Sequence, residues 1–89
     1  MNYFDKRADI PAVINLGYHR ITVTQVTRAA MRDLGGILKN GDTCEGLWDC
    51  DKETIYLLSN LAWRKKRYYL MHEMVHACLD LMDSLETGP

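Results

Sequence analysis

The feature that most constrains this chain is the pentapeptide His72-Glu73-Met74-Val75-His76, an HExxH motif that uses two of the three histidines. Residues four apart on a helix lie on the same face, so the imidazoles of His72 and His76 can bind one zinc ion. The carboxylate of Glu73 can then act as general base toward a metal-bound water. The motif predicts a helix here and a zinc-dependent hydrolase, with peptide-bond cleavage as the favoured reaction.

The composition predicts one small globular domain covering residues 1–89. The chain is 47% hydrophobic and 26% charged with a net charge of −1, so no global field draws it to nucleic acid or to acidic membranes. No apolar run approaches the roughly 20 residues that span a bilayer, and Met1–Arg7 lacks the apolar stretch of a secretory signal. Three cysteines, an odd number, fit a reducing compartment. The expected location is the cytoplasm.

The first half of the chain predicts β-structure followed by a helix. Residues 12–23 carry two apolar runs around Gly17 and are expected to be extended, with a hairpin as one arrangement. Thr24 is the expected N-cap of a first helix, which Gly35-Gly36 ends or loosens.

The second half predicts a hairpin and then the helix that carries the motif. Residues 46–48 and 54–58 are short apolar runs separated by a polar stretch, and Ser59 or Asn60 is the expected cap of the final helix. The apolar residues of that helix predict a stripe that faces the core, with His72 and His76 at its shoulder. The stripe consists of Met71, Met74, Val75, Cys78, Leu81, Met82 and Leu85.

A catalytic zinc needs a third protein ligand and an open position for water. Glu86 is the preferred in-chain candidate, provided that the helix ends near Ser84 or Leu85 and lets it fold back. Asp80 lies about 12 Å along the helix axis from His72, which suits it to accept a hydrogen bond from an imidazole instead, although a solvated helix residue is the favoured interpretation. His19, a partner chain or a segment outside this chain are the other sources considered.

The stretch from Thr54 to Leu81 resembles the core of SprT-like (Spartan-type) zinc metalloproteases. It has a strand ending in Leu-Leu-Ser, a basic segment, and then Leu-Met-His-Glu-Met-Val-His-Ala-Cys-Leu. It is similar, more loosely, to the ImmA/IrrE group and to minimal gluzincin peptidases. The resemblance covers roughly a third of the chain. It implies an α+β zincin-like core: a short antiparallel or mixed sheet, a supporting helix and a C-terminal HExxH helix.

The same resemblance implies that His72 and His76 are zinc ligands and that Glu73 is the catalytic base. It also makes the strand Thr54–Leu58, which contains Tyr56, the edge strand that holds an extended peptide. The third histidine of the SprT-like pattern has no counterpart, because no histidine follows His76.

Other residues near the motif have weaker assignments. Tyr69 lies three residues before His72, where it can donate to an oxyanion, although packing is the favoured role. The basic run Arg64–Arg67, flanked by aromatic residues, can contact nucleic acid, although a solvated helix start is favoured.

Two further functions stay open beside the peptidase. Because the third ligand is missing, the chain can be a non-catalytic zincin-like protein that binds a macromolecular partner. Cys44 and Cys50 can also join His72 and His76 as a Cys2His2 structural zinc site, although their spacing departs from that of zinc fingers.

Overall fold

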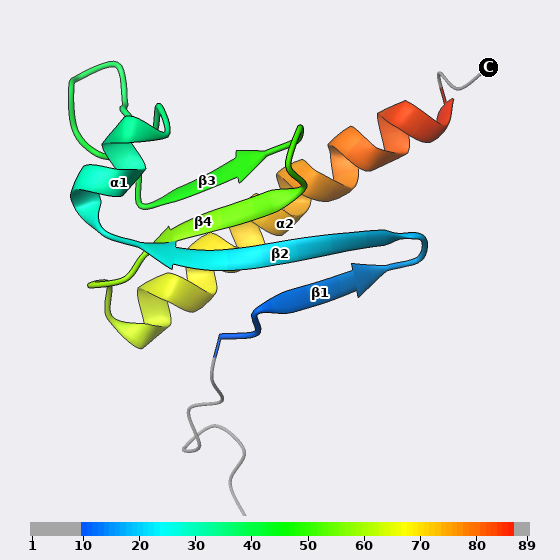
Figure 1. Cartoon of the computed structure of the whole chain (residues 1–89), viewed down its shortest axis with the longest axis horizontal. Helices are drawn as coiled ribbons and strands as arrows, with labels where there is room; N and C mark the ends of the chain where they lie inside the picture. The colour runs from blue at the N-terminus through cyan, green and yellow to red at the C-terminus, as the bar shows by residue number, and fades with distance from the viewer. Residues whose placement is uncertain (1–9, 87–89) are drawn as a thin grey trace, which may run out of the picture.

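The computed structural model describes residues 10–86, with side chains through residue 82. Along the chain, the elements are β1 (Val13–Leu16), β2 (His19–Val26), α1 (Arg28–Asp33), β3 (Gly46–Asp49), β4 (Thr54–Leu58) and α2 (Trp63–Glu86). They form a four-stranded mixed sheet and two helices, which confirms the predicted α+β class (Figure 1). None of the helices in the described part is long and apolar enough to cross a membrane.

The sheet has the strand order β1-β2-β4-β3. The pairs β1–β2 and β3–β4 are antiparallel, whereas β2 and β4 are parallel and are joined by a connection that contains α1 and β3. The predicted hairpin around Gly17 is confirmed: Gly17 has φ +59, a conformation that glycine adopts without strain. All five residues of β4 are buried, as expected for a central strand covered on both faces.

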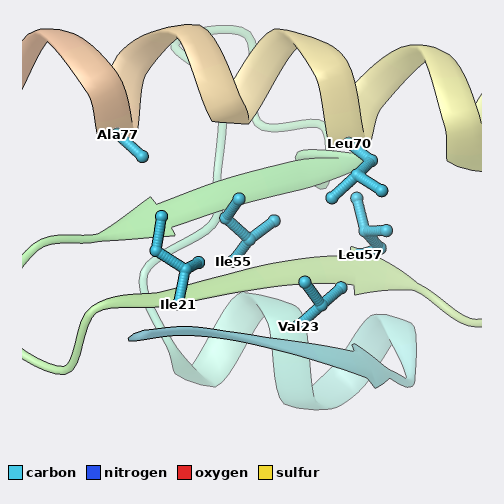
Figure 2. Packing of buried hydrophobic residues seen from close by; sticks show 6 residues of the cluster. All are labelled: Ile21, Val23, Ile55, Leu57, Leu70 and Ala77. Carbon is cyan, nitrogen blue, oxygen red and sulfur yellow. The ribbon is translucent and has the colours of Figure 1, made fainter. Parts of the chain in front are cut away.

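One face of the sheet packs against α2, which lies across the strands (Figure 1). Figure 2 shows Leu70 and Ala77 of the helix directed at side chains of β2 and β4. The buried cluster consists of Ile21, Val23, Ile55, Leu57, Leu70 and Ala77. The opposite face carries a second cluster, in which Met31 of α1 packs with Tyr56 and Leu58 of β4. The sheet is therefore the middle layer, and α2 has one side left for solvent.

Both helix starts differ from the prediction. β2 continues through Thr24 to Val26, and Thr27 is the N-cap of α1: its side chain accepts a hydrogen bond from the Ala30 amide at 3.1 Å. Thr24 instead pairs with Tyr56 in the parallel ladder, which takes precedence over the local capping signal.

The final helix begins later than expected. Ser59 and Asn60 form a turn after β4, where the Ser59 amide donates to the Val26 carbonyl. α2 begins at Trp63, and the Lys66 amide donates to the Ala62 carbonyl. Ser59 therefore extends the pairing of β4 with β2, and Ala62 rather than Ser59 or Asn60 directly precedes the helix.

The prediction of which side of α2 faces the core was wrong for three of its seven members. Met71, Val75 and Met82 are 64%, 58% and 55% exposed, whereas Leu70 and Ala77 are buried. The helix is apolar on more than one side, so a 3.6-residue period alone fits several stripes. Of the other predicted members, Met74 and Leu81 pack partly against the core, Cys78 is half-buried, and the Leu85 side chain lies outside the described residues.

Candidate metal centre

The two motif histidines lie on successive turns in the middle of α2 and are both exposed. Their Nε2 atoms are 3.3 Å apart, close enough for one neutral imidazole to donate to the other. Two nitrogens bound to one tetrahedral zinc at about 2.0–2.1 Å must also lie about 3.3 Å from each other. The imidazoles therefore already have the separation that a shared zinc ion requires.

Glu73 lies between these histidines in sequence but points toward the sheet and is only 7% exposed. Burial raises the pKa of its carboxyl group, while His76 and His72 act in the opposite direction. The carboxylate is therefore near both imidazoles and in a poorly hydrated position. This combination favours proton uptake and suits a general base.

Gly46, the first residue of β3, makes room for Glu73. A Cβ at this position would lie 3.2 Å from both Cγ and Oε2 of Glu73 and 3.3 Å from Cβ of Tyr69. These distances are shorter than ordinary van der Waals contacts, so with a side chain here Glu73 and Tyr69 would have to shift by a few tenths of an ångström. The absence of a side chain on Gly46 allows α2 to approach β3 at the motif.

Tyr69 faces β3 and is anchored there. Its hydroxyl donates to Oε1 of Glu45 at 3.0 Å, and this hydrogen bond raises the pKa of the Tyr69 phenol. The Lys65 ammonium lies 3.9 Å from the other oxygen of Glu45. The tyrosine thus contributes packing and a bond to the start of β3, in line with the favoured prediction.

Asp80 holds the other end of β3. Its Oδ2 accepts a hydrogen bond of 2.6 Å from the indole Nε1 of Trp48. The bond from an imidazole that was considered for Asp80 is not found among the described residues, where His76 is instead paired with His72. Through its bond with Trp48, Asp80 helps to fix the strand against the motif helix.

β3 is an edge strand, and β4 is not. β4 lies between β2 and β3, so the expectation that Thr54–Leu58 is the edge strand was wrong. The Leu58 amide donates to the Glu45 carbonyl at 3.1 Å, which makes these two residues a hydrogen-bonded pair. Since such pairs alternate along an antiparallel ladder, the N–H and C=O groups of Gly46 and Trp48 point to the open side of β3.

Tyr56 does not reach the motif. It is buried on the sheet face opposite α2, together with Met31 and Leu58. A one-residue alternation separates Tyr56 from Ile55 and Leu57, whose side chains face the helix. As a substrate or second-layer candidate, Tyr56 is therefore corrected to a core residue.

Among the described residues, no group of three or more His, Cys, Asp or Glu side chains could hold a metal ion. His19 is bonded elsewhere, through Nδ1 to Oε2 of Glu53 at 2.9 Å. The Glu86 side chain lies outside the described residues, and α2 continues to Glu86 without the earlier helix end that its folding back requires. The described part supplies two ligands, His72 and His76.

Cys44 and Cys50 are not brought together. β3 separates them, and its four residues alone span about 10 Å. Cys50 is exposed in the turn after the strand. Burial and the nearby Glu73 raise the pKa of the Cys44 thiol, which disfavours the thiolate that zinc requires. The Cys2His2 arrangement is therefore absent from the described residues.

The basic run at the start of α2 is partly engaged within the chain. The Arg67 guanidinium lies 5.5 Å from the ring centroid of Trp63, and Lys65 faces Glu45. These contacts fit the favoured prediction of an ordinary helix start.

Sequence reasoning did not assign Gly46, Trp48 and Glu45 to the site. A short apolar run at Gly46–Trp48 was visible, but its edge position depends on the parallel pairing of β2 with β4. That pairing joins residues about 32 positions apart, such as Val23 and Ile55, and local patterns carry no signal for it.

Comparisons of the chain with protein-family models, with curated proteins and with solved structures found no match.

Proposed function

We propose that this chain is a zincin-like zinc-dependent peptidase. The observation that carries the proposal is the 3.3 Å separation of the His72 and His76 Nε2 atoms, which equals the spacing of two ligands on tetrahedral zinc. The buried carboxylate of Glu73 beside them adds a candidate base. The resemblance of the stretch from Thr54 to Leu81 to SprT-like proteases agrees with both assignments.

The motif residues have separate roles in the proposed reaction. His72 and His76 would hold the zinc ion, which supplies Lewis-acid activation of a water molecule and of the scissile carbonyl. Glu73 would act as the general base toward a water activated in this way and would deliver the proton to the leaving amine. Its raised pKa favours proton uptake, because a more basic carboxylate is a stronger proton acceptor.

The open side of β3 supports an extended peptide as substrate. Gly46 and Trp48 offer two amide donors and two carbonyl acceptors, which can pair with a peptide by strand addition. This strand lies beside the helix side that carries the motif, since Tyr69, Glu73 and Asp80 all contact it. A bound peptide would therefore run past the two histidines.

The compartment proposed is the cytoplasm. Cys44, Cys50 and Cys78 are all free thiols, and unpaired cysteines persist where the medium is reducing.

A second candidate function is a non-catalytic zincin-like protein that binds a macromolecular partner. It is favoured by one observation: the described residues supply two histidine ligands and no third. On this alternative the open side of β3 still binds an extended segment, but no bond is cleaved.

The first experiment is the zinc content of tag-free protein purified without chelator, by elemental mass spectrometry. We expect about one zinc ion per chain, none in His72→Ala, and an unchanged content in the matched control His19→Ala, whose imidazole is bonded to Glu53. Wild-type protein free of zinc would overturn the metal site. Zinc retained by Glu73→Gln without peptide turnover supports the peptidase, whereas a zinc-loaded wild type that cleaves no peptide library favours the binding alternative.

A further inference from the structure

The side of α2 that faces away from the sheet carries a continuous apolar surface. Five of its side chains are between 55% and 64% exposed. We call this set the outer stripe; its members are Tyr68, Met71, Val75, Leu79 and Met82. They follow one another at spacings of three, four, four and three residues, so they lie on one side of the helix over about 21 Å of its length.

The outer stripe does not pack against the sheet, and the ring of Tyr68 contacts those of Tyr69 and His72 on the same helix. The sheet contacts α2 through the buried side chains of Leu70 and Ala77, on the other side of the helix. A continuous row of large apolar side chains on the surface of a small protein marks an interaction site more often than an accident. The outer stripe is therefore a candidate interaction surface.

The arrangement of the stripe is symmetric about Val75. Met71 and Leu79 lie four residues before and after it, and Tyr68 and Met82 lie seven residues before and after it. A two-fold interface requires such self-complementarity. When residue i of one copy contacts residue j of the other, residue j of the first copy also contacts residue i of the second. Two α2 helices packed antiparallel, with Val75 at the axis, would place an apolar residue opposite every member of the stripe.

The charges at the two ends of α2 favour the same pairing. The basic run Arg64–Arg67 precedes the outer stripe, whereas Asp83 and Glu86 follow it in the sequence of the helix. Arg64 and Glu86 are each eleven residues from Val75. Antiparallel packing therefore brings opposite charges together and opposes the helix dipoles, whereas parallel packing would bring like charges together.

We propose that the outer stripe is a homodimer interface, formed by the α2 helices of two copies packed antiparallel about a two-fold axis at Val75. The axis of two antiparallel helices is perpendicular to the plane that contains both. Groups on one flank of α2 therefore stay on the same side in both copies. The dimer presents both HExxH histidine pairs, and both β3 edges, on one surface. The pairing itself requires no metal.

The test is sedimentation equilibrium in buffer with chelator, so that zinc cannot link two chains. Wild-type protein at about 100 μM is expected to be a dimer. Val75→Lys places two like charges at the axis and should give a folded monomer. The matched control Leu38→Lys changes an apolar residue that is 49% exposed on the loop before β3, and it should stay dimeric. A monomeric wild type would overturn the proposal.

A charge exchange tests the antiparallel direction without touching the motif. Arg64→Glu with Arg67→Glu leaves Lys65 and Lys66 and so removes the net positive charge of the N-terminal end, whereas Asp83→Lys with Glu86→Lys makes both ends basic. Each variant alone should dimerise more weakly than wild type, and an equimolar mixture should form the mixed dimer. A mixture no more associated than the separate variants contradicts antiparallel pairing. Zinc content is measured on separate preparations of the same proteins purified without chelator. A protein that dimerises in chelator but carries no zinc in those preparations removes the proposed metal function and leaves the interface standing.

Discussion

The indole nitrogen of Trp48 donates to Oδ2 of Asp80 at 2.6 Å and joins the edge strand β3 to the motif helix. The contact lies one helical turn beyond His76, and the bond from Tyr69 to Glu45 lies at the other end of the strand. β3 is thus tied to α2 on both sides of Glu73. The position of the strand against the motif depends on these two hydrogen bonds and on the close approach at Gly46.

We expect Trp48→Phe to lower the free energy of unfolding by about 1 kcal/mol through the lost bond, because the contact is solvent-exposed and a hydrogen bond to a charged group is weakened there. Chemical denaturation of Trp48→Phe, Asp80→Ala and the double variant isolates the pairwise contribution. Additive losses in the double variant would show that the two residues stabilise the protein independently.

Gly46→Ala is expected to cost about 1–3 kcal/mol of stability, since its Cβ would lie 3.2 Å from Glu73, whose side chain would have to shift. The same substitution should cost less in a Glu73→Ala background, where the Cγ and carboxylate are gone. The free energy of unfolding is measured with urea. An equal loss of stability in both backgrounds would show that the added methyl group does not clash with Glu73.

The stability of the metal-free protein should depend on pH through Glu73. Burial raises the folded-state pKa of this carboxyl above its ordinary value of 4.5, so the folded state binds the proton more tightly than the unfolded chain does. The stabilising contribution is fully present below the unfolded-state pKa and is lost as pH rises through the folded-state pKa. Wild type should therefore lose stability relative to Glu73→Gln over this range. A difference that stays constant from pH 4 to pH 8, measured with chelator present, contradicts the assignment.

Thr27→Ala should destabilise the protein by about 1 kcal/mol, because the Ala30 amide loses its capping oxygen. The matched substitution Thr27→Ser keeps the hydroxyl and should retain most of the stability. Thermal unfolding of the two variants separates the cap from simple loss of side-chain volume, and an equal effect of both would argue against capping.

Zinc should stabilise the folded chain by mass action. At a free concentration about 100 times its Kd, a ligand that binds only the folded state adds about 2.7 kcal/mol. The increase should vanish in His72→Ala and in His76→Ala. The measurement is thermal unfolding with and without zinc. A comparable increase in stability in either variant would show that the metal binds at another place.

Sequence patterns predicted the parts of this molecule that depend on local chemistry. The hairpin at Gly17 follows from alternating apolar runs around a residue that tolerates positive φ, and the α+β class follows from short runs before a long helix. The motif helix was expected because His72 and His76 must lie one helical turn apart to bind the same metal ion.

The parts that depend on distant contacts could not be predicted in the same way. From the local sequence alone, Thr24 fits a helix N-cap. Its pairing with Tyr56 of β4 places it in β2 instead. The stripe through Met71 and Val75 has the right period for a core face, but Leu70 and Ala77 have it as well. Packing against the sheet, with Glu73 fitted at Gly46, selects between these sides, and that information is tertiary.

The open side of β3 has a further consequence for the sequence of any peptide that binds there. Within β3, Gly46 and Trp48 direct their amide and carbonyl groups outward. A paired peptide is therefore hydrogen-bonded at every second residue. Proline lacks the amide hydrogen that such pairing needs. When a single proline is moved along a bound peptide, binding should weaken at alternate positions only. The positions that weaken binding would show which peptide residues pair with Gly46 and Trp48.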